Sequence, residues 1–91
     1  MKLLLCVECA DVRKLQYHDT YCDCGRSVGR YLADGAHAEH SGPSIVIGLD
    51  NRDVRKLVHG IAKRAEVWRM DPDDPGVRVR RVEPSPRPGG R

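Results

Sequence analysis

The four cysteines of this chain lie in two closely spaced pairs near the beginning of the sequence, Cys6-x-x-Cys9 and Cys22-x-Cys24. Each pair can present two thiolates from one tight turn, and two such turns can close a tetrahedral site of four sulfurs. Four thiolates leave no coordination position open for water. The spacing therefore predicts a structural zinc site rather than a catalytic one.

Other uses of these cysteines stay open. Two disulfides would also staple a small chain, but residues 3–5 are followed by charge too early for a signal peptide, so we expect the reducing cytoplasm, where paired cysteines favour metal. An iron centre of the rubredoxin type more usually has two Cys-x-x-Cys pairs. A redox-active Cys-x-x-Cys pair normally opens a helix, whereas residues 11–17 look extended. His18 is the nearest replacement ligand, although we expect it in a solvated turn.

The composition bounds the size of the core. The chain has 91 residues, of which 32% are charged, and it contains no phenylalanine. Such a chain forms one small domain with a thin core that benefits from a staple. Zinc binding to finger peptides supplies about 10–16 kcal/mol, which exceeds the whole stability of a small domain. No apolar run is long enough to span a membrane, so we expect a cytoplasmic protein without membrane contact.

Charge is distributed unevenly along the chain. Residues 1–50 carry five basic and seven acidic side chains, a net charge of −2, whereas residues 51–91 carry eleven and six, a net charge of +5. A centre of four thiolates and one zinc ion would add a further −2 to the first half. The molecule is therefore expected to be electrostatically two-sided.

Short strands and turns are expected to position the cysteines. Residues 2–7 are apolar enough for a first strand, and residues 12–17 can pair with it as a hairpin. Gly25 follows the second cysteine pair where a metal-binding turn needs a positive φ, and Ala10 occupies the equivalent place after the first pair. Residues 26–32 predict another strand, in which Gly29 marks a bulge or a close approach.

The middle of the chain predicts one buried strand. Residues 33–43 read as a loop with a short strand around His37–His40, and residues 44–49 (SIVIGL) form the most apolar run of the chain. Such a run is typical of a central, buried strand.

One amphipathic helix is expected after this strand. Asp50 is suited to cap its N-terminus, and the helix is predicted to run from residue 51 to about residue 66 and to pack on the buried strand. Its apolar stripe consists of Val54, Leu57, Val58, Ile61, Ala62 and Ala65. Gly60 lies in the middle of the pattern and weakens it.

The C-terminal part predicts a hairpin followed by a tail. Residues 67–70 and 77–80 are prone to form strands and flank a turn rich in proline, aspartate and glycine. Trp68 is expected in the core. Residues 83–91 (EPSPRPGGR) contain no apolar side chain and predict a disordered tail.

A basic surface is the second candidate site. It combines the polar helix face with the C-terminal arginines, namely Arg52, Arg55, Lys56, His59, Lys63, Arg78, Arg80 and Arg81. Such a stripe could contact a few phosphates, or it could be the solvated face that any amphipathic helix has. A net charge of only +3 and the lack of an exposed aromatic set argue against nucleic acid.

Neither the histidines nor any other motif predicts catalysis. His37-x-x-His40 would hold a second metal only on a helix, and the neighbouring glycines and serine favour solvated histidines in a loop. The sequence contains no nucleophile elbow, glycine-rich phosphate loop or paired carboxylate motif. We therefore expect that the protein is not an enzyme.

Two short pieces of the sequence resemble a known group of proteins. They are residues 22–27 (CDCGRS) and residues 41–43 (SGP), within a likeness that covers residues 1–58. The chain resembles small, uncharacterised zinc-ribbon-like proteins of bacteria and their phages. Ala10 departs from this pattern, since such proteins tend to have glycine there. The resemblance implies a zinc-ribbon fold and no assigned activity.

Together these observations predict a single α+β domain over residues 1–82, a zinc ribbon of antiparallel strands with one helix. Its parts are a ribbon (1–32), a loop (33–43), a strand and helix (44–66) and a hairpin (67–82). The predicted function is a non-catalytic, zinc-stabilised binding module, either an adaptor between proteins or a phage-encoded modulator of a host factor. The alternative is a nucleic-acid-binding ribbon that uses the basic surface, and a thiol redox or iron protein is a third hypothesis. The sequence leaves the partner's identity and the oligomeric state open.

Overall fold

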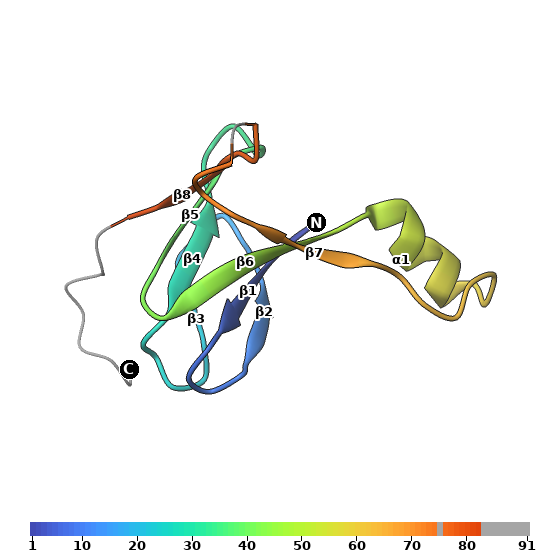
Figure 1. The fold of residues 1–91 in the computed structure, drawn as a ribbon, viewed down its shortest axis with the longest axis horizontal. Coiled ribbons are helices and arrows are strands. Elements are labelled where there is room, and N and C mark those ends of the chain that lie inside the picture. The colour runs from blue at the N-terminus through green and yellow to red at the C-terminus, as the bar shows by residue number, and fades with distance from the viewer. Residues whose placement is uncertain (75, 83–91) are drawn as a thin grey trace.

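Two four-stranded sheets and one short helix make up the computed structural model, which describes residues 1–74 and 76–82 (Figure 1). The sheet that we call sheet A has the order β2-β1-β6-β7, and sheet B has the order β3-β4-β5-β8. The elements are β1 (Lys2–Cys6), β2 (Val12–Lys14), β3 (Thr20–Tyr21), β4 (Val28–Tyr31), β5 (Ala38–Ser41), β6 (Ser44–Leu49), α1 (Asn51–Val58), β7 (Val67–Met70) and β8 (Val79–Arg81). The fold is thus a small mixed α+β fold.

Sheet A confirms the first predicted hairpin and the apolar strand. β1 pairs with β2 in antiparallel register, Leu3 opposite Lys14, although β2 ends at Lys14 rather than at residue 17. β6 has the predicted bounds and lies between β1 and β7. Its burial alternates along the strand, so only one of its faces is fully covered. β6 is therefore the central strand that the sequence predicts, with one face in the core.

Sheet B confirms one prediction and corrects another. The short strand expected around residues 37–40 is present as β5, and all four of its residues are buried. The late hairpin is wrong, because β7 pairs with β6 in sheet A whereas β8 pairs in parallel with β5 in sheet B. Val79 lies opposite Ala38 in this parallel pair, and both side chains belong to the core. The burial of Val79 in the core thus holds β8 in sheet B, where it cannot form a local hairpin with β7. The expectation that all strands are antiparallel is wrong as well.

The core lies between the two sheets. Its buried apolar residues are Leu4, Leu15, Ala38, Val46 and Val79. Gly29 on β4 allows the sheets to approach closely, since a Cβ atom there would lie 2.8 Å from Leu15 Cδ2. The close approach expected at Gly29 is therefore confirmed.

Helix α1 is shorter than predicted and does not join the core. Asp50 caps it as expected, its carboxylate accepting a hydrogen bond of 2.7 Å from the backbone N–H of Arg52. The helix ends at Val58 because Gly60 adopts a positive φ of 73° and Ile61 N–H donates to the Lys56 carbonyl at 2.9 Å, a Schellman termination. It contains no buried residue.

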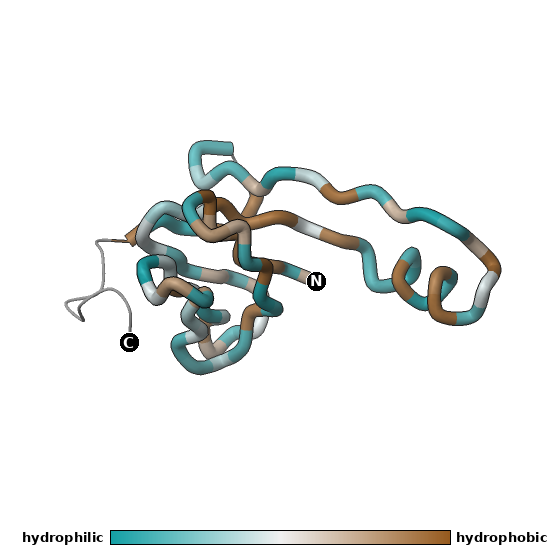
Figure 2. Tube along the Cα trace, turned by 90° about the horizontal axis from the view of Figure 1, so that it is seen from below, coloured by the Kyte–Doolittle hydropathy of each residue, from teal (hydrophilic) through white to brown (hydrophobic). Residues whose placement is uncertain are grey.

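The segment that we call the arm, residues 51–66, consists of α1 and its connection to β7. It projects from one end of the two sheets (Figures 1 and 2). Val58 and Ile61 are each 75% exposed. The prediction that the apolar stripe packs on β6 is therefore wrong. The described part of the chain has no helix with the length and apolar character of a membrane span, and the predicted tail 83–91 lies outside the described residues.

Candidate metal centre

Two tight turns place the cysteine pairs. Cys6 is the last residue of β1, and the first turn closes where Ala10 N–H donates to the Cys6 carbonyl at 2.9 Å. In the second turn Gly25 N–H donates to the Cys22 carbonyl at 3.0 Å. Gly25 has the positive φ that was predicted, 78°, and Ala10 adopts nearly the same conformation at 60°. The two turns therefore have similar backbones, although Ala10 is strained where glycine would not be.

The turns bring all four cysteine sulfurs together. Every pair of these sulfurs lies within 4.8 Å, with 3.7 Å between Cys6 and Cys24 and 3.3 Å between Cys22 and Cys24. All four cysteines are free, so no disulfide links them. Zinc–sulfur bonds of about 2.3 Å in a tetrahedron place the sulfurs about 3.8 Å apart. The donor set and its spacing therefore fit a metal ion of this kind.

The pKa values of the cysteine thiols differ. Burial raises the pKa of Cys6, but the Ser27 hydroxyl and nearby backbone N–H groups outweigh it and lower that pKa to about 6. The Ser27 hydroxyl is buried and has no conventional hydrogen-bond partner among the described residues. The N–H of Arg26 favours the Cys24 thiolate, yet the adjacent Cys22 sulfur opposes it and the pKa of Cys24 rises to about 12. Four thiolates this close need a cation, which a divalent metal supplies.

Two polar bridges tie one cysteine turn to the other. The Asp11 carboxylate accepts a hydrogen bond of 2.7 Å from Asp23 N–H and also contacts Arg13 Nε at 2.5 Å. The Arg13 guanidinium thereby holds the pKa of Asp11 below its usual value. Glu8, between the first two cysteines, pairs with Arg26 at 2.6 Å. Sequence reasoning missed these bridges because their partners come from different turns.

The turn between β5 and β6 packs against both cysteine turns. Gly42 has a φ of 85°, and a Cβ atom there would lie 2.1 Å from the Arg26 carbonyl oxygen. The Pro43 carbonyl accepts a hydrogen bond of 2.8 Å from Val7 N–H. The two sequence pieces that carry the predicted resemblance, residues 22–27 and 41–43, are thus in contact, and no side chain other than hydrogen fits at Gly42.

The predicted basic surface does not exist as one surface. Its members on α1, Arg52, Arg55 and Lys56, are exposed, but His59 is the C-cap and Lys63 lies beyond the helix. The C-terminal arginines, Arg78, Arg80 and Arg81, lie at and just before β8, at the other side of the molecule from α1 (Figure 1). The prediction assumed a helix twice as long and a hairpin beside it, and neither is present.

Two of the C-terminal arginines have structural partners. Arg80 pairs with the Glu39 carboxylate on the neighbouring strand. Arg81 donates to the Gly42 carbonyl at 2.5 Å and to the Ser44 carbonyl at 3.5 Å. These contacts fix β8 against the rest of the molecule rather than offering a free cationic row.

The histidine prediction is correct for His18 and His37, which are exposed, and wrong for His40. His40 is 3% exposed, and its ring lies beside Ser44 and Val46 of β6. Its Nδ1 lies 2.9 Å from Ser44 Oγ. Burial, reinforced by the Arg81 charge, lowers the pKa of His40 to about 4. Within the described residues, the cysteines form the one cluster that could hold a metal ion.

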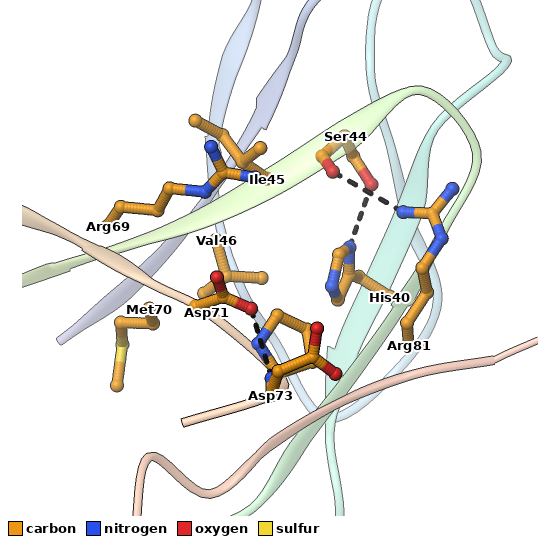
Figure 3. Close-up of a pocket in the computed structure, with 10 residues that line it drawn as sticks. His40, Ser44, Ile45, Val46, Arg69, Met70, Asp71, Asp73 and Arg81 are labelled. Atoms are coloured by element: carbon orange, nitrogen blue, oxygen red, sulfur yellow. Dashed lines mark hydrogen bonds between the residues drawn. The ribbon is translucent and has the colours of Figure 1, made fainter. Parts of the chain in front are cut away.

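A pocket of about 330 Å³ lies beside His40 (Figure 3). It is lined by two guanidinium groups, Arg69 and Arg81, and by two carboxylates, Asp71 and Asp73, so its charges select no single class of ligand. The Ser44 hydroxyl donates to the Ser41 carbonyl at 3.1 Å, so His40 donates to Ser44. A nucleophile and its base require the opposite direction.

Sheet A has an apolar outer face that was not predicted from the sequence. Residues that alternate with the core positions point away from sheet B, and the register aligns them across the strands. We call this set the outer face of sheet A: Leu3, Leu5, Val12, Ile45, Ile47, Leu49 and Val67. All seven are at least partly exposed, and no other described element covers them as a layer. The apolar run SIVIGL was the signal for it.

Comparisons of the chain with protein-family models, with curated proteins and with solved structures return no match. The resemblance to zinc-ribbon-like proteins therefore stays a prediction, and function has to be argued from the cysteine cluster and the surfaces.

Proposed function

We propose that this protein is a non-catalytic, zinc-stabilised module that binds another protein through the outer face of sheet A. The proposal has two parts, a structural metal and a binding surface. The observation that carries it is the partly exposed apolar face of a sheet whose opposite face is already packed in the core.

Zinc is the metal that this donor set favours. Four cysteines supply soft ligands in a closed tetrahedral set, and such sites hold zinc more often than iron. Cys6 ends β1 of sheet A, and Cys22 directly follows β3 of sheet B. A metal bound here would link the two sheets at one end. Its role is then to hold the fold together.

The binding surface follows from the register of sheet A. One row across the strands reads Lys14, Leu3, Ile47 and Arg69, so that two aliphatic side chains lie between two cations. A neighbouring row reads Val12, Leu5 and Ile45. Antiparallel sheets that face water on one side usually place polar residues there. An apolar patch rimmed by charge is typical of a protein interface.

The charges around this face favour an acidic partner. Lys14 and Arg69 frame it on its two edge strands. Leu49 and Val67 extend the outer face of sheet A as far as the arm. The arm has five basic and two acidic side chains, which give it a net charge of +3. A second copy of this chain would bring the same cations together. The partner that fits best is a protein surface with aliphatic side chains flanked by aspartate or glutamate.

A photo-reactive residue in place of Ile47 tests this proposal in the protein's own host cells. The matched control carries the same residue in place of Arg30, which is exposed on the outer face of sheet B. We expect the Ile47 variant to cross-link to one protein at an acidic, aliphatic segment and the Arg30 variant not to do so. Cross-linking to nucleic acid, to a second copy of the chain, or equally from both positions would contradict the proposal.

A further inference from the structure

A second surface, which adjoins the outer face of sheet A at Lys14, lies where the beginning of β1 meets the beginning of α1. It is a groove of about 480 Å³. Its lining comes from four elements and includes Lys2 of β1, Lys14 of β2, Tyr31 of β4, and Asn51 and Arg55 of α1. These residues are far apart in the sequence, and of the five only Arg55 belonged to the predicted basic surface.

The groove gathers three cationic side chains, and no carboxylate lies in its lining. Lys14 and Arg55 form no ion pair with any described residue. The Lys2 ammonium donates to the Ala36 carbonyl at 2.9 Å and lies 5.5 Å from the centre of the Tyr31 ring. It therefore has a fixed position but no direct anionic partner.

The carboxylate that raises the pKa of Lys2, that of Asp34, already has hydrogen-bond partners. Burial lowers the pKa of Lys2, the Arg78 charge lowers it further, and Asp34 opposes them. Asp34 accepts hydrogen bonds from the N–H groups of Ala36 and His37, at 2.9 and 3.0 Å, and pairs with the His37 ring. Its carboxylate is thus held by its own turn.

The neutral groups of the lining also favour an anion. Lys2 N–H donates to the Tyr31 hydroxyl oxygen at 2.9 Å, which leaves the phenol hydrogen free to donate. Asn51 contributes a side-chain amide, and Arg55 can present two parallel N–H groups. The groove therefore combines cationic and neutral donors on several sides. A group with several acceptor oxygens and more than one negative charge matches it best.

We propose that this groove binds a phosphate group, carried by a phosphorylated small molecule or by the backbone of a nucleic acid. Lys14 and Arg55 provide the charge, Lys2 provides a pre-positioned ammonium, and the Tyr31 hydroxyl donates from the side. The two sources share the same phosphate chemistry, so the experiment has to separate them.

Pyrophosphate is the probe, titrated into the isotope-labelled, zinc-loaded protein at low ionic strength. We expect saturable shifts of the amide signals of Lys2, Lys14, Tyr31 and Arg55. Lys14→Gln and Arg55→Gln should each weaken binding about tenfold, because each removes a charged hydrogen-bond donor. Lys63→Gln removes an equal charge from an exposed residue outside the groove and should leave the affinity unchanged.

A parallel titration with a short oligothymidylate separates the sources. A nucleic-acid site should bind it more tightly than pyrophosphate and lose affinity more steeply with salt, since several phosphates are contacted. A small-molecule site should prefer pyrophosphate and show the shallower salt dependence. The proposal is overturned if the signals move without saturation, or if Lys63→Gln weakens pyrophosphate binding as much as Lys14→Gln does.

Discussion

The outer faces of the two sheets differ in chemistry, although both sheets have four strands and share one core. On sheet B the outer face carries a cross-strand set of Arg30, Glu39 and Arg80, in which the carboxylate pairs with both guanidinium groups. On sheet A the corresponding positions of the central strands, such as Leu3 and Ile47, are aliphatic. Sheet B is adapted to water, whereas sheet A has the composition of a face that another surface covers.

Burial within one chain therefore does not account for all of its apolar residues. In sheet B the polar side chains satisfy one another, so that the face needs nothing further. In sheet A the inner residues, such as Leu4 and Val46, already form the core. The outer aliphatic residues add nothing to that core, which is why we assign them to a partner.

Removal of the metal should have the largest effect, because the cysteine cluster joins the two sheets. Chelation, or Cys22→Ser, should abolish cooperative thermal unfolding measured by circular dichroism. The zinc-binding energy of finger peptides, about 10–16 kcal/mol, exceeds the net stability of most small domains. Added zinc should restore the chelated wild-type chain but not the Cys22→Ser chain. An unchanged melting curve in chelator would show that neither sheet depends on the cluster.

Leu3→Ala and Leu4→Ala compare the two faces of one strand. Leu4 is fully buried in the core, so its truncation should reduce the free energy of unfolding by about 2–5 kcal/mol. Leu3 belongs to the partly exposed outer face, so its truncation should reduce it by less than about 1 kcal/mol and should weaken partner binding instead. Urea unfolding and partner affinity measure the two effects. Equal losses of stability would mean that the outer face is covered within the chain itself.

The buried His40 should make stability depend on pH. Its pKa is lowered to about 4 in the folded state, so the unfolded chain binds the proton more readily. Its contribution is therefore complete above the unfolded pKa of about 6.5 and is lost as the pH falls from there through 4, by at most about 3 kcal/mol. His40→Gln should remove this part of the dependence. The difference in the free energy of unfolding between the wild-type and His40→Gln chains separates the His40 contribution from the acid lability of the cysteine cluster. Curves of stability against pH that run parallel for the two chains would contradict this prediction.

Glu39→Gln should have the smallest effect and tests the polar face of sheet B. The Arg80 guanidinium, with that of Arg30, holds the pKa of Glu39 below its usual value, so its contribution is present at neutral pH and is lost as the pH falls through that lowered value. Because both arginines are exposed, we expect a loss of about 1 kcal/mol at low salt and less at high salt. The comparison variant is Ile47→Gln on sheet A. Its loss of free energy of unfolding should be the same at low and at high salt. A salt-independent loss in Glu39→Gln would show that packing, not charge, stabilises this face.

Local features were predictable from the sequence. The cysteine turns, the positive φ at Gly25, the first hairpin and the Asp50 cap each depend on residues close together in the chain. The length of α1 was not predicted correctly, because the apolar period continues past Gly60 although the glycine ends the helix. Residues 62 and 65 continue the apolar period of the sequence, but they lie outside the helix in the structure.

Long-range pairings could not be predicted. The separation of β7 from β8, and with it the burial of His40, depends on which strand each one finds as a neighbour. The groove at Lys14 and Arg55 combines elements that only the tertiary fold brings together. The outer face of sheet A is an intermediate case, because the apolar run of β6 was visible in the sequence but the partial exposure of one of its faces was not.

The central claim is that the outer face of sheet A, and not that of sheet B, binds another protein. Isothermal titration of the cross-linked partner, once purified, tests it with zinc-loaded wild-type protein, Ile47→Ser and Arg30→Ser. The claim predicts that Ile47→Ser weakens binding more than about tenfold, the loss of one buried anchor residue, while Arg30→Ser changes it less than about twofold. Equal effects of the two substitutions, or a loss confined to Arg30→Ser, would contradict it.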